Sequence, residues 1–477
     1  MPSAPKKQTI GLFPFMMVTL AIIITVRNIP TLSEAGMQMF FYMLVAVVGY
    51  LLPCALVSAE LGSGWPQAGG VYVWVKEAFG ERFGFTAIWL QWFQMTIGMV
   101  MLLTAIGGTL AYAIDTNLET SKLFILAVSL ATYWIATMVN MKGLKTSSMV
   151  STFCVWLGVF IPGILIILLG IVYVITGNPI HFDTTISTSN MIPDIFSVGN
   201  LSILIGFVFV FLGLEVSAAH VNNLENPQHN YPLAVLVAAL ITIAINLIGA
   251  LAVASVIPQS DINLVAGIMQ AIDQFLQVFG LTILIPVIAI LIAVGGAGQI
   301  STWVLGPSTG LLITGKKGNL PLSLQQVNKN GVPRNLLILQ AGLVSFFCLI
   351  FAVIPGINQA YWQILAMTTI VYGFMYLLVY LSVIRLRYLK PGIERSYKIP
   401  GGVPGVWLVA GLGFAVMLLA MIVSFVPPEQ VPVENISLYL GEMVAGTVLM
   451  IALPFVIYHL KRPSWKDEEI PDETGGS

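Results

Sequence analysis

The stretch that decides the fold is MMVTLAIIITVRNIPTLSEAG, residues 16–36. It begins as an apolar run typical of a membrane-spanning helix, but Arg27, Asn28 and Pro30 interrupt it after about two thirds of its length. Proline lacks a backbone N–H and clashes with the preceding helical turn, so we expect Pro30 to break the helix and leave backbone carbonyls without partners. A plain anchor needs no such interruption, which makes this segment a candidate site.

A second interrupted run is LSILIGFVFVFLGLEVSAAHVNNLENP, residues 201–227. Gly213, Glu215 and Ser217 interrupt it at a comparable depth. Broken helices in corresponding positions of two halves indicate a binding site near the membrane midplane. Opened helix ends offer free N–H groups to a carboxylate and free C=O groups to an amine, and an α-amino acid carries both.

The composition of the whole chain fits a polytopic membrane protein. Of the 477 residues, 57% are hydrophobic and 9% charged, and the mean hydropathy is +0.92. A soluble domain cannot bury so much apolar surface. We therefore expect an all-α membrane protein with about 12 transmembrane helices. The predicted spans are 11–33, 37–61, 84–113, 122–140, 149–176, 197–222, 231–257, 279–314, 335–354, 360–385, 404–426 and 436–460. In a 5+5 inverted repeat, the first and sixth spans would open the two halves.

Lysine and arginine are distributed unevenly along the chain. Eighteen of the 20 fall in the even-numbered gaps between spans or at the termini, Lys122 falls in an odd-numbered gap, and Arg27 lies inside a span. Cytoplasmic loops are rich in Lys and Arg, so both termini are predicted to be cytoplasmic.

Three charged residues in or near spans are candidate functional groups. Burying the Glu215 carboxylate costs at least ~2.5 kcal/mol, so we expect it to titrate or to gate; the alternative is a structural carboxylate bound by backbone N–H groups. Glu60 is either a gate or a packing charge at the cytoplasmic end of its span. Arg27 lies ~24 Å into the first span and either pairs with an acidic substrate or vestibule carboxylate, or reaches the outer interface.

Aromatic residues provide a further signal. Tyr372, Tyr376 and Tyr380 recur at a spacing of four, which places them on one helix face. Phe209 precedes Gly213, and Trp303 follows the polar residue Gln299 closely. These side chains are either the wall and lid of a binding site or ordinary packing.

The sequence does not favour an enzyme or a metal site. Cys54, Cys154 and Cys348 all fall in predicted spans, which argues against a disulfide framework and a metal cluster. The four histidines are scattered over span ends and loops. We expect no cofactor and no nucleic-acid partner, and small molecules and the lipid bilayer as the partners.

Several segments carry a resemblance to a known family. The chain resembles the amino acid–polyamine–organocation superfamily and, within it, the bacterial glutamate/GABA antiporters, over nearly its whole length. The segments that carry the resemblance are GGVYVWV (69–75), GLEVSAAHVNNLENPQHNYPLAV (213–235), WVLGPSTG (303–310), NKNGVP (328–333), IPGG (399–402) and SFVPP (424–428).

The resemblance implies a leucine-transporter-type fold that works by alternating access in the cell (inner) membrane. The expected divisions are a cytoplasmic N-terminus (1–10), a ten-helix transport core (11–385), two peripheral helices (386–460) and a short cytoplasmic tail (461–477). It implies that one amino acid enters while a related one leaves, with glutamate and GABA, or another decarboxylation product, as the expected pair.

The resemblance also assigns site residues. Ile23, Ile24 and Thr25 fall on the unwound part of the first span, Phe209 on an aromatic lid, and Trp303 on an aromatic gate. Glu215 matches a Gly-x-Glu pattern, and Tyr372 and Tyr376 match two tyrosines of the antiporters. The predicted substrate-binding residues are Ile23, Ile24, Thr25, Arg27, Phe209, Gly213, Trp303, Tyr372 and Tyr376. The predicted gating or proton-coupling residues are Glu60, Glu215 and Gln299.

The chain departs from these antiporters at three points. Arg27-Asn28-Ile29-Pro30 stands where they resemble Tyr-Glu-Tyr-Pro, and Gln299 stands where they carry a glutamate. This change from acidic toward basic favours an anionic substrate or a different charge stoichiometry. About 17 residues follow the last span, which we judge too few to plug the cytoplasmic mouth, so pH gating is predicted to be weaker.

Other functions remain open at this point. A proton-coupled symporter would not depend on an internal counter-substrate, and a non-transporting amino acid sensor would bind without transport. A channel would need a continuous polar pore and a filter, and the sequence shows neither.

Overall fold

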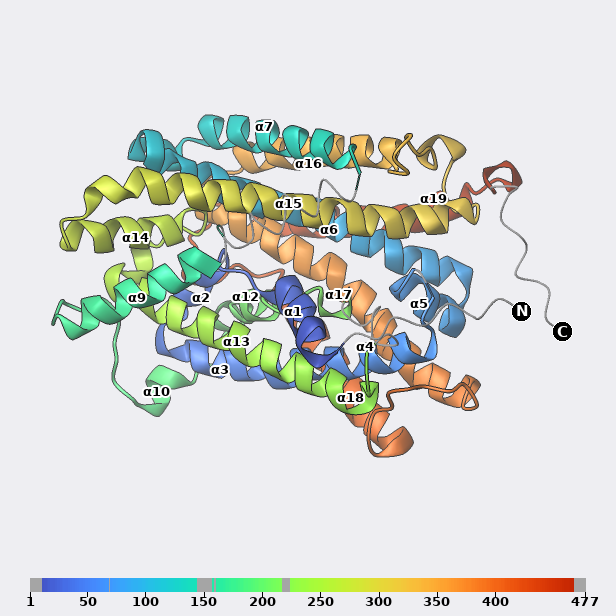
Figure 1. Ribbon diagram of the computed structural model, residues 1–477. Helices are drawn as coiled ribbons and strands as arrows, with labels where there is room; N and C mark the ends of the chain where they lie inside the picture. The colour runs from blue at the N-terminus through green and yellow to red at the C-terminus, as the bar shows by residue number, and fades with distance from the viewer. Residues whose placement is uncertain (1–10, 68, 144–156, 158–159, 217–223, 467–477) are drawn as a thin grey trace.

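The computed structural model describes residues 11–67, 69–143, 157, 160–216 and 224–466. Figure 1 shows a bundle of long helices whose axes run roughly side by side, linked by short helices and loops at the two ends. The expectation of an all-α fold is confirmed for this part of the chain, which contains no β-strand, although Lys317 and Lys466 form an isolated β-bridge.

Ten segments of the described chain are long and apolar enough to cross a membrane. They are Gly36–Gly64, which includes α3 (Met39–Ala46) and α4 (Leu52–Gly64); α6 (Glu81–Ile114); α7 (Lys122–Asn140); Val198–Val216, which includes α11 (Val198–Ser202) and α12 (Leu204–Phe209); α13 (Pro227–Val256); Thr282–Ile300, which leads into α15 (Ile285–Lys316); α16 (Arg334–Val353); α17 (Ile357–Leu389); α18 (Gly402–Val423); and α19 (Ile436–His459).

Two further predicted spans correspond to shorter helices. The first contains α1 (Leu12–Ile23) and α2 (Ile29–Ser33), and the fifth contains α9 (Ile161–Ile175). Because most of residues 149–160 lie outside the described part, the total of twelve spans stays a prediction. The pairing of the two halves as an inverted repeat also stays a prediction.

Helix α6 forms the middle of the bundle. Most of its side chains are buried, and it packs against α15, α17 and α7. Small residues bring the neighbours close, since a Cβ on Gly296 of α15 would lie 2.9 Å from Ile106 of α6. Close backbone approach of this kind is the usual way in which membrane helices gain packing energy. The centre of the bundle is therefore closely packed, and the broken helices lie around it.

The first span is broken, as predicted, but Pro30 does not cause the break, and Ile23, expected on the unwound part, is still helical. Helix α1 ends at Ile23, Ile24 is extended with φ −75° and ψ 123°, and α2 starts at Ile29. Pro30 therefore lies in the first turn of α2, where a backbone N–H has no helical acceptor and proline costs little. The interruption covers Ile24 to Asn28, and Pro30 starts the next helix instead of breaking the previous one.

The sixth span is interrupted at Gly213, as predicted. Helix α12 ends at Phe209, and Gly213 has φ +95°, a conformation that residues with a side chain rarely adopt. Figure 1 places α12 beside α1 and α2, and α12 also contacts α2. The two broken spans thus meet inside the bundle. Ser217, the third predicted interruption, lies outside the described residues.

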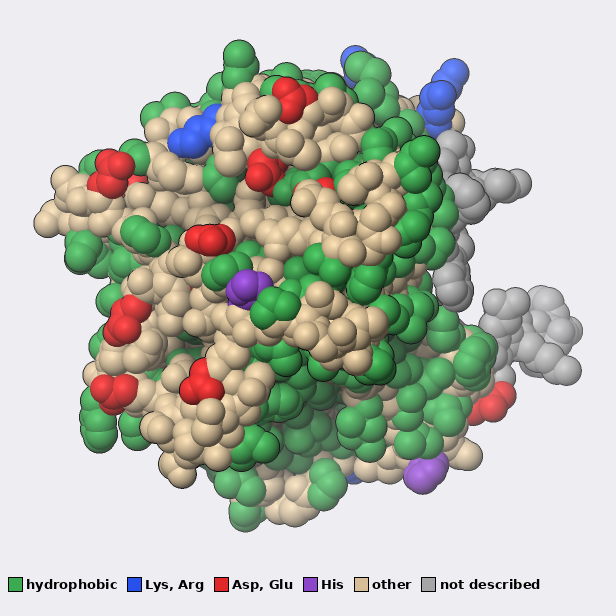
Figure 2. Space-filling model, turned by 90° about the vertical axis from the view of Figure 1, so that its left-hand side faces the viewer, with side chains coloured by type: hydrophobic (Ala, Val, Ile, Leu, Met, Phe, Trp, Pro, Cys, Tyr) green, Lys and Arg blue, Asp and Glu red, His purple; other side chains and the backbone are tan. Residues whose placement is uncertain are grey.

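The ends of the bundle differ in charge. The short helix α5 (Val71–Phe79) lies between two predicted spans, in an even-numbered gap, and at the same end as the last turn of α19 (Figure 1). The opposite end carries α10 (Thr188–Met191) and α14 (Gly267–Val278), and Figure 2 shows acidic side chains scattered over this face with few Lys or Arg. We refer to the α5 end as the predicted cytoplasmic end.

Some predictions fall on residues outside the described part. These are the N-terminal segment 1–10, residues 217–222 of the sixth span, residues 467–477 of the tail, and Cys154.

Candidate functional site

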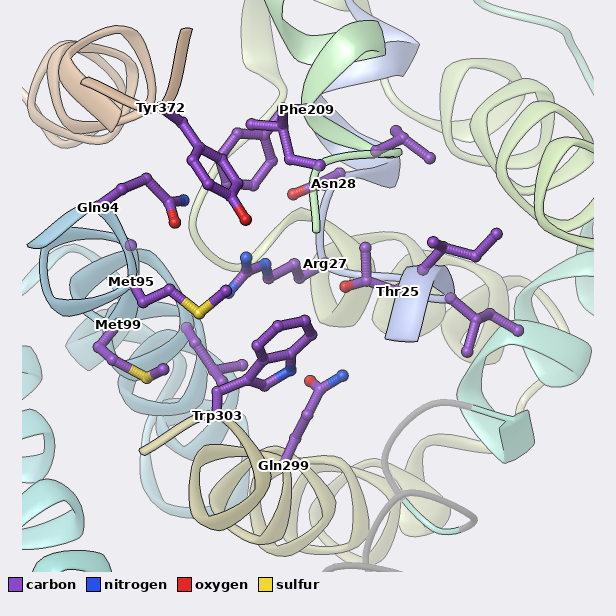
Figure 3. Close-up of a pocket in the computed structure, with 16 residues that line it drawn as sticks. Thr25, Arg27, Asn28, Gln94, Met95, Met99, Phe209, Gln299, Trp303 and Tyr372 are labelled. Atoms are coloured by element: carbon purple, nitrogen blue, oxygen red, sulfur yellow. The ribbon is translucent and has the colours of Figure 1, made fainter. Parts of the chain in front are cut away.

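A cavity lies where the two interruptions meet, and Figure 3 shows the side chains around it. Its walls come from the α1–α2 linker, α6, the residues after α12, α15 and α17. The lining residues are Ile23, Ile24, Thr25, Arg27, Asn28, Gln94, Met95, Gly98, Met99, Leu102, Phe209, Val210, Leu212, Gln299, Trp303 and Tyr372.

The unwound backbone of the first span supplies free polar groups beside the cavity. In the described part of the chain, the N–H groups of residues 25–28 have no backbone hydrogen bond, whereas the Ile29 N–H donates to the Val26 carbonyl at 3.1 Å. Unpaired backbone groups in an apolar setting need other partners. A polar ligand in the cavity would provide them.

Arg27 extends into the middle of the cavity in Figure 3. Its guanidinium carbon lies 5.6 Å from the centre of the Phe209 ring, a cation–π contact. Its Nε is buried and has no hydrogen-bond partner, and among the described residues Arg27 forms no salt bridge. Arg27 as a residue is partly buried, and a guanidinium in an apolar setting without an anion is costly, so this group is suited to a negatively charged ligand.

Two further cavity residues have buried polar atoms without partners. Both side-chain polar atoms of Asn28 and the amide oxygen of Gln94 are in this condition. Native proteins satisfy most buried polar groups, and each exception calls for an explanation. Three unsatisfied side chains around one cavity are explained together if the cavity takes up a polar ligand.

Glu215 lies behind the cavity wall and is held by three neutral donors. Gln91 of α6 donates to it at 2.8 Å, and the hydroxyls of Tyr372 and Tyr376 of α17 donate to its two carboxylate oxygens. Glu215 is not itself a lining residue, whereas Tyr372 is. Tyr372 therefore connects the carboxylate to the cavity. The spacing of four places Tyr372 and Tyr376 on one face of α17, from which both hydroxyls reach Glu215.

Gly213 lies between Tyr376, which binds Glu215, and the ring of Trp303 in the cavity wall. Its N–H donates to the Tyr376 hydroxyl at 3.1 Å, and a Cβ at this position would lie 3.3 Å from the Trp303 ring. The positive φ and the close ring both favour glycine. The break in the sixth span thus lets the Trp303 ring pack against the backbone of Gly213.

A second cavity adjoins the first on the side of α14. It shares Thr25, Arg27, Leu102 and Gln299 with the first cavity and extends to Val265 and other residues next to α14. That direction is the predicted outer end. Arg27 and Gln299 stand at the boundary between the two spaces, so their side chains separate the first cavity from the second.

Glu60 does not line this cavity, and its partners lie elsewhere in the bundle. Its carboxylate accepts two hydrogen bonds from Arg387, at 2.5 and 2.6 Å, and one from the Ile399 N–H at 2.9 Å, and Arg395 lies 3.5 Å away. This ionic cluster ties α4 to the end of α17 and to the following loop at the predicted cytoplasmic end. Burial and the Glu60 charge raise the pKa of Tyr397 in that loop to about 12, so its phenol stays neutral.

The structure brings most of the predicted site residues together. Ile23, Ile24, Thr25, Arg27, Phe209, Gln299, Trp303 and Tyr372 line the cavity, Gly213, Glu215 and Tyr376 lie directly behind them, and Glu60 lies elsewhere. Their roles in binding stay predictions. The sequence analysis missed Asn28, Gln91, Gln94 and Met95. Two glutamines three residues apart in an apolar span were the available signal for α6.

Comparison with known proteins places this chain in a family. The sequence profile described as amino acid permease matches residues 10–452, which is most of the chain. The chain belongs to the amino acid permease family. The resemblance to the amino acid–polyamine–organocation superfamily is thereby confirmed, and the permease is a multi-pass membrane transporter and not an enzyme.

Individual relatives agree with this assignment. The permease is 34% identical to a glutamate/gamma-aminobutyrate antiporter of Lactococcus lactis over 461 residues, which cover 95% of this chain and 91% of that protein. It is 34% identical to an uncharacterized transporter of Legionella pneumophila over 453 residues, 94% of this chain and 97% of the relative. A probable agmatine/putrescine antiporter of Lactococcus lactis is 21% identical over 462 residues, 93% and 96% of the two chains.

Proposed function

We propose that this permease is an amino acid antiporter of the cell (inner) membrane, with both termini in the cytoplasm. It exchanges glutamate, or a closely related amino acid, for GABA or another decarboxylation product. The observation that carries this proposal is the cavity at the two helix breaks, where Arg27, Asn28 and Gln94 have buried polar atoms without partners. The likeness to glutamate/gamma-aminobutyrate antiporters supports the choice of substrates.

Each part of an amino acid substrate has a complementary group in this cavity. The α-carboxylate accepts hydrogen bonds from the unpaired N–H groups of residues 25–28, and the ammonium group donates to the open carbonyls at the end of α1. A carboxylate on the side chain pairs with Arg27. Trp303 and Phe209 cover the aliphatic part of the substrate, which favours burial of its methylene groups.

Alternating access requires a closure on each side of this cavity. On the predicted cytoplasmic side, the cluster of Glu60, Arg387 and Arg395 holds α4, α17 and the following loop together. On the other side, the second cavity leads outward past Arg27 and Gln299. We assign Glu60 to the inner gate, Gln299 to the outer boundary, and Glu215 to coupling between substrate and α17 through Tyr372.

The proposal predicts that glutamate uptake requires an internal amino acid. Purified protein would be reconstituted into vesicles loaded with GABA, with glutamate, with a neutral amino acid or with nothing, and entry of labelled external glutamate would be followed. Because an antiporter returns only with substrate bound, we expect at least about tenfold faster uptake into the best loaded vesicles than into empty ones. The internal amino acid that gives the fastest uptake identifies the pair.

Other outcomes would contradict the proposal in different ways. Equal uptake into empty vesicles, driven by a proton gradient, would support a proton-coupled symporter. Binding of glutamate to the purified protein without uptake under any loading would support a sensor. Vesicles without protein are the control for leakage.

A further inference from the structure

The charges around the cavity determine the form in which a substrate fits. Arg27 is the charged residue among those that line the cavity, and no aspartate or glutamate is found among the described lining residues. We propose that the cavity binds its amino acid substrate as a net anion, with the side-chain carboxylate ionised and paired with Arg27. This inference rests on the proposed function and specifies which protonation state of the substrate is carried.

The surroundings of Arg27, a partly buried residue, favour an anion as its partner. Its Nε is buried without a partner, and its guanidinium carbon faces the Phe209 ring at 5.6 Å. Arginine stays protonated in proteins, so it does not escape the cost of burial by losing its charge. A zwitterionic substrate with an uncharged side chain brings no net charge to offset this cation. A substrate with one extra carboxylate does.

Glu215 does not provide this missing charge. Its carboxylate oxygens already accept hydrogen bonds from Gln91, Tyr372 and Tyr376, and no salt bridge joins it to Arg27 in the described part of the chain. Three neutral donors therefore satisfy the oxygens of Glu215 without a cation. Arg27 and Glu215 have separate surroundings, and of the two only Arg27 lines the cavity.

The described side chains that line the cavity with Arg27 are neutral at ordinary pH. Tyr361 and Tyr372 of α17 are the titratable side chains that face Arg27, and phenols remain protonated below about pH 10, whereas Glu215 lies behind Tyr372 and outside the lining. Asn28, Gln94 and Gln299 carry no charge in any protonation state relevant to proteins. The charge of the empty cavity is thus fixed while glutamate itself titrates near about pH 4.3. Any pH dependence of the relative affinity for two substrates should then arise from titration of a substrate side chain and not from titration of the protein.

Glutamine provides a matched control for this property. It has nearly the shape of glutamate, carries the same α-amino and α-carboxyl groups, and has a side chain that does not titrate. Any effect of pH on the protein that alters both ligands alike cancels in the ratio of the two dissociation constants. The ratio of the glutamate Kd to the glutamine Kd therefore isolates the charge of the substrate side chain.

The experiment measures both dissociation constants for the purified full-length protein between about pH 5.5 and about pH 7.5, where glutamate is mostly ionised. If the net anion binds, the ratio should change by less than about threefold over this range and glutamate should bind more tightly than glutamine. If the protonated, net-neutral form binds, the ratio should rise by about tenfold for each pH unit, because that form becomes rarer by this factor. The second result would overturn the inference.

Two variants test the part played by Arg27. Arg27→Gln should weaken glutamate binding by at least about tenfold at neutral pH and leave glutamine binding within about threefold, whereas Arg27→Lys should keep the preference for glutamate. An unchanged preference in Arg27→Gln would contradict the pairing. If that variant does not fold, the pH series on the unaltered protein still decides.

The same measurements separate this inference from the proposed function. Exchange of glutamate in loaded vesicles together with a ratio that rises steeply with pH would leave the antiporter proposal standing and refute the anionic substrate. No binding and no exchange of either amino acid would refute both.

Discussion

Replacing Arg27 with glutamine should lower kcat/KM for glutamate by about 30- to 150-fold, while transport of glutamine changes by less than about threefold. A hydrogen bond to a charged group contributes about 1.5–3 kcal/mol, and every 1.4 kcal/mol corresponds to a factor of ten, so the stated loss lies in the upper part of this range. The loss is confined to acidic substrates because Arg27 has no salt-bridge partner in the described part of the protein. Initial rates in preloaded vesicles give both constants.

The stability of this variant serves as its control. Arg27 is a partly buried cation whose Nε lacks a partner, so its removal should not lower the thermal unfolding temperature of the substrate-free protein. Equal losses of glutamate and glutamine transport at unchanged stability would show that Arg27 acts on the transport cycle and not on the substrate side chain. That result would contradict its assignment as a substrate-binding residue.

Replacing Glu60 with alanine should destabilise the protein by about 3–5 kcal/mol, because it leaves two buried arginines without their carboxylate. The side chain of Glu60 is 1% exposed, and those of Arg387 and Arg395 are 13% and 2% exposed. The Ile399 N–H also loses its acceptor. Thermal unfolding in detergent should show a decrease in Tm of at least about 5 °C.

The pair between Glu77 and Lys390 provides a matched comparison on the same end of the bundle. These side chains are 26% and 40% exposed, so Glu77→Ala should cost less than about 1 kcal/mol. Similar Tm values for the two variants would indicate that the Glu60 cluster does not hold the predicted cytoplasmic end together. In that case its assignment as an inner gate would lose its physical basis.

The sequence was sufficient to predict the all-α fold and the positions of both interruptions. A charged residue in an apolar span is costly unless it has a function, and a glycine weakens a helix. Arg27, Gly213 and Glu215 could therefore be recognised without any structure. The error concerned Pro30, since the same residue either breaks a helix or begins one, and only the preceding backbone conformation distinguishes these cases.

The contacts between spans were less predictable. Gln91 and Gln94 appeared as two polar residues in a long apolar helix, and nothing in their spacing indicates that one binds Glu215 and the other faces the cavity. Glu60 looked equally suited to a gate or to packing, because its partners lie more than 300 residues further along the chain. Such pairings depend on which helices become neighbours, and an isolated sequence pattern does not contain that information.

The central claim is that the cavity at the two helix breaks is the transport site, and filling it tests that claim most directly. Gly98 lines the cavity, whereas Gly342 lies on an exposed face of α16 with nothing within 4 Å of an added Cβ. Exchange of labelled glutamate would be measured for Gly98→Trp and Gly342→Trp at equal amounts of folded protein. We predict that Gly98→Trp loses at least about 90% of exchange and that Gly342→Trp keeps most of it, because only the first indole occupies the substrate's space. Undiminished exchange by folded Gly98→Trp would show that the substrate passes elsewhere.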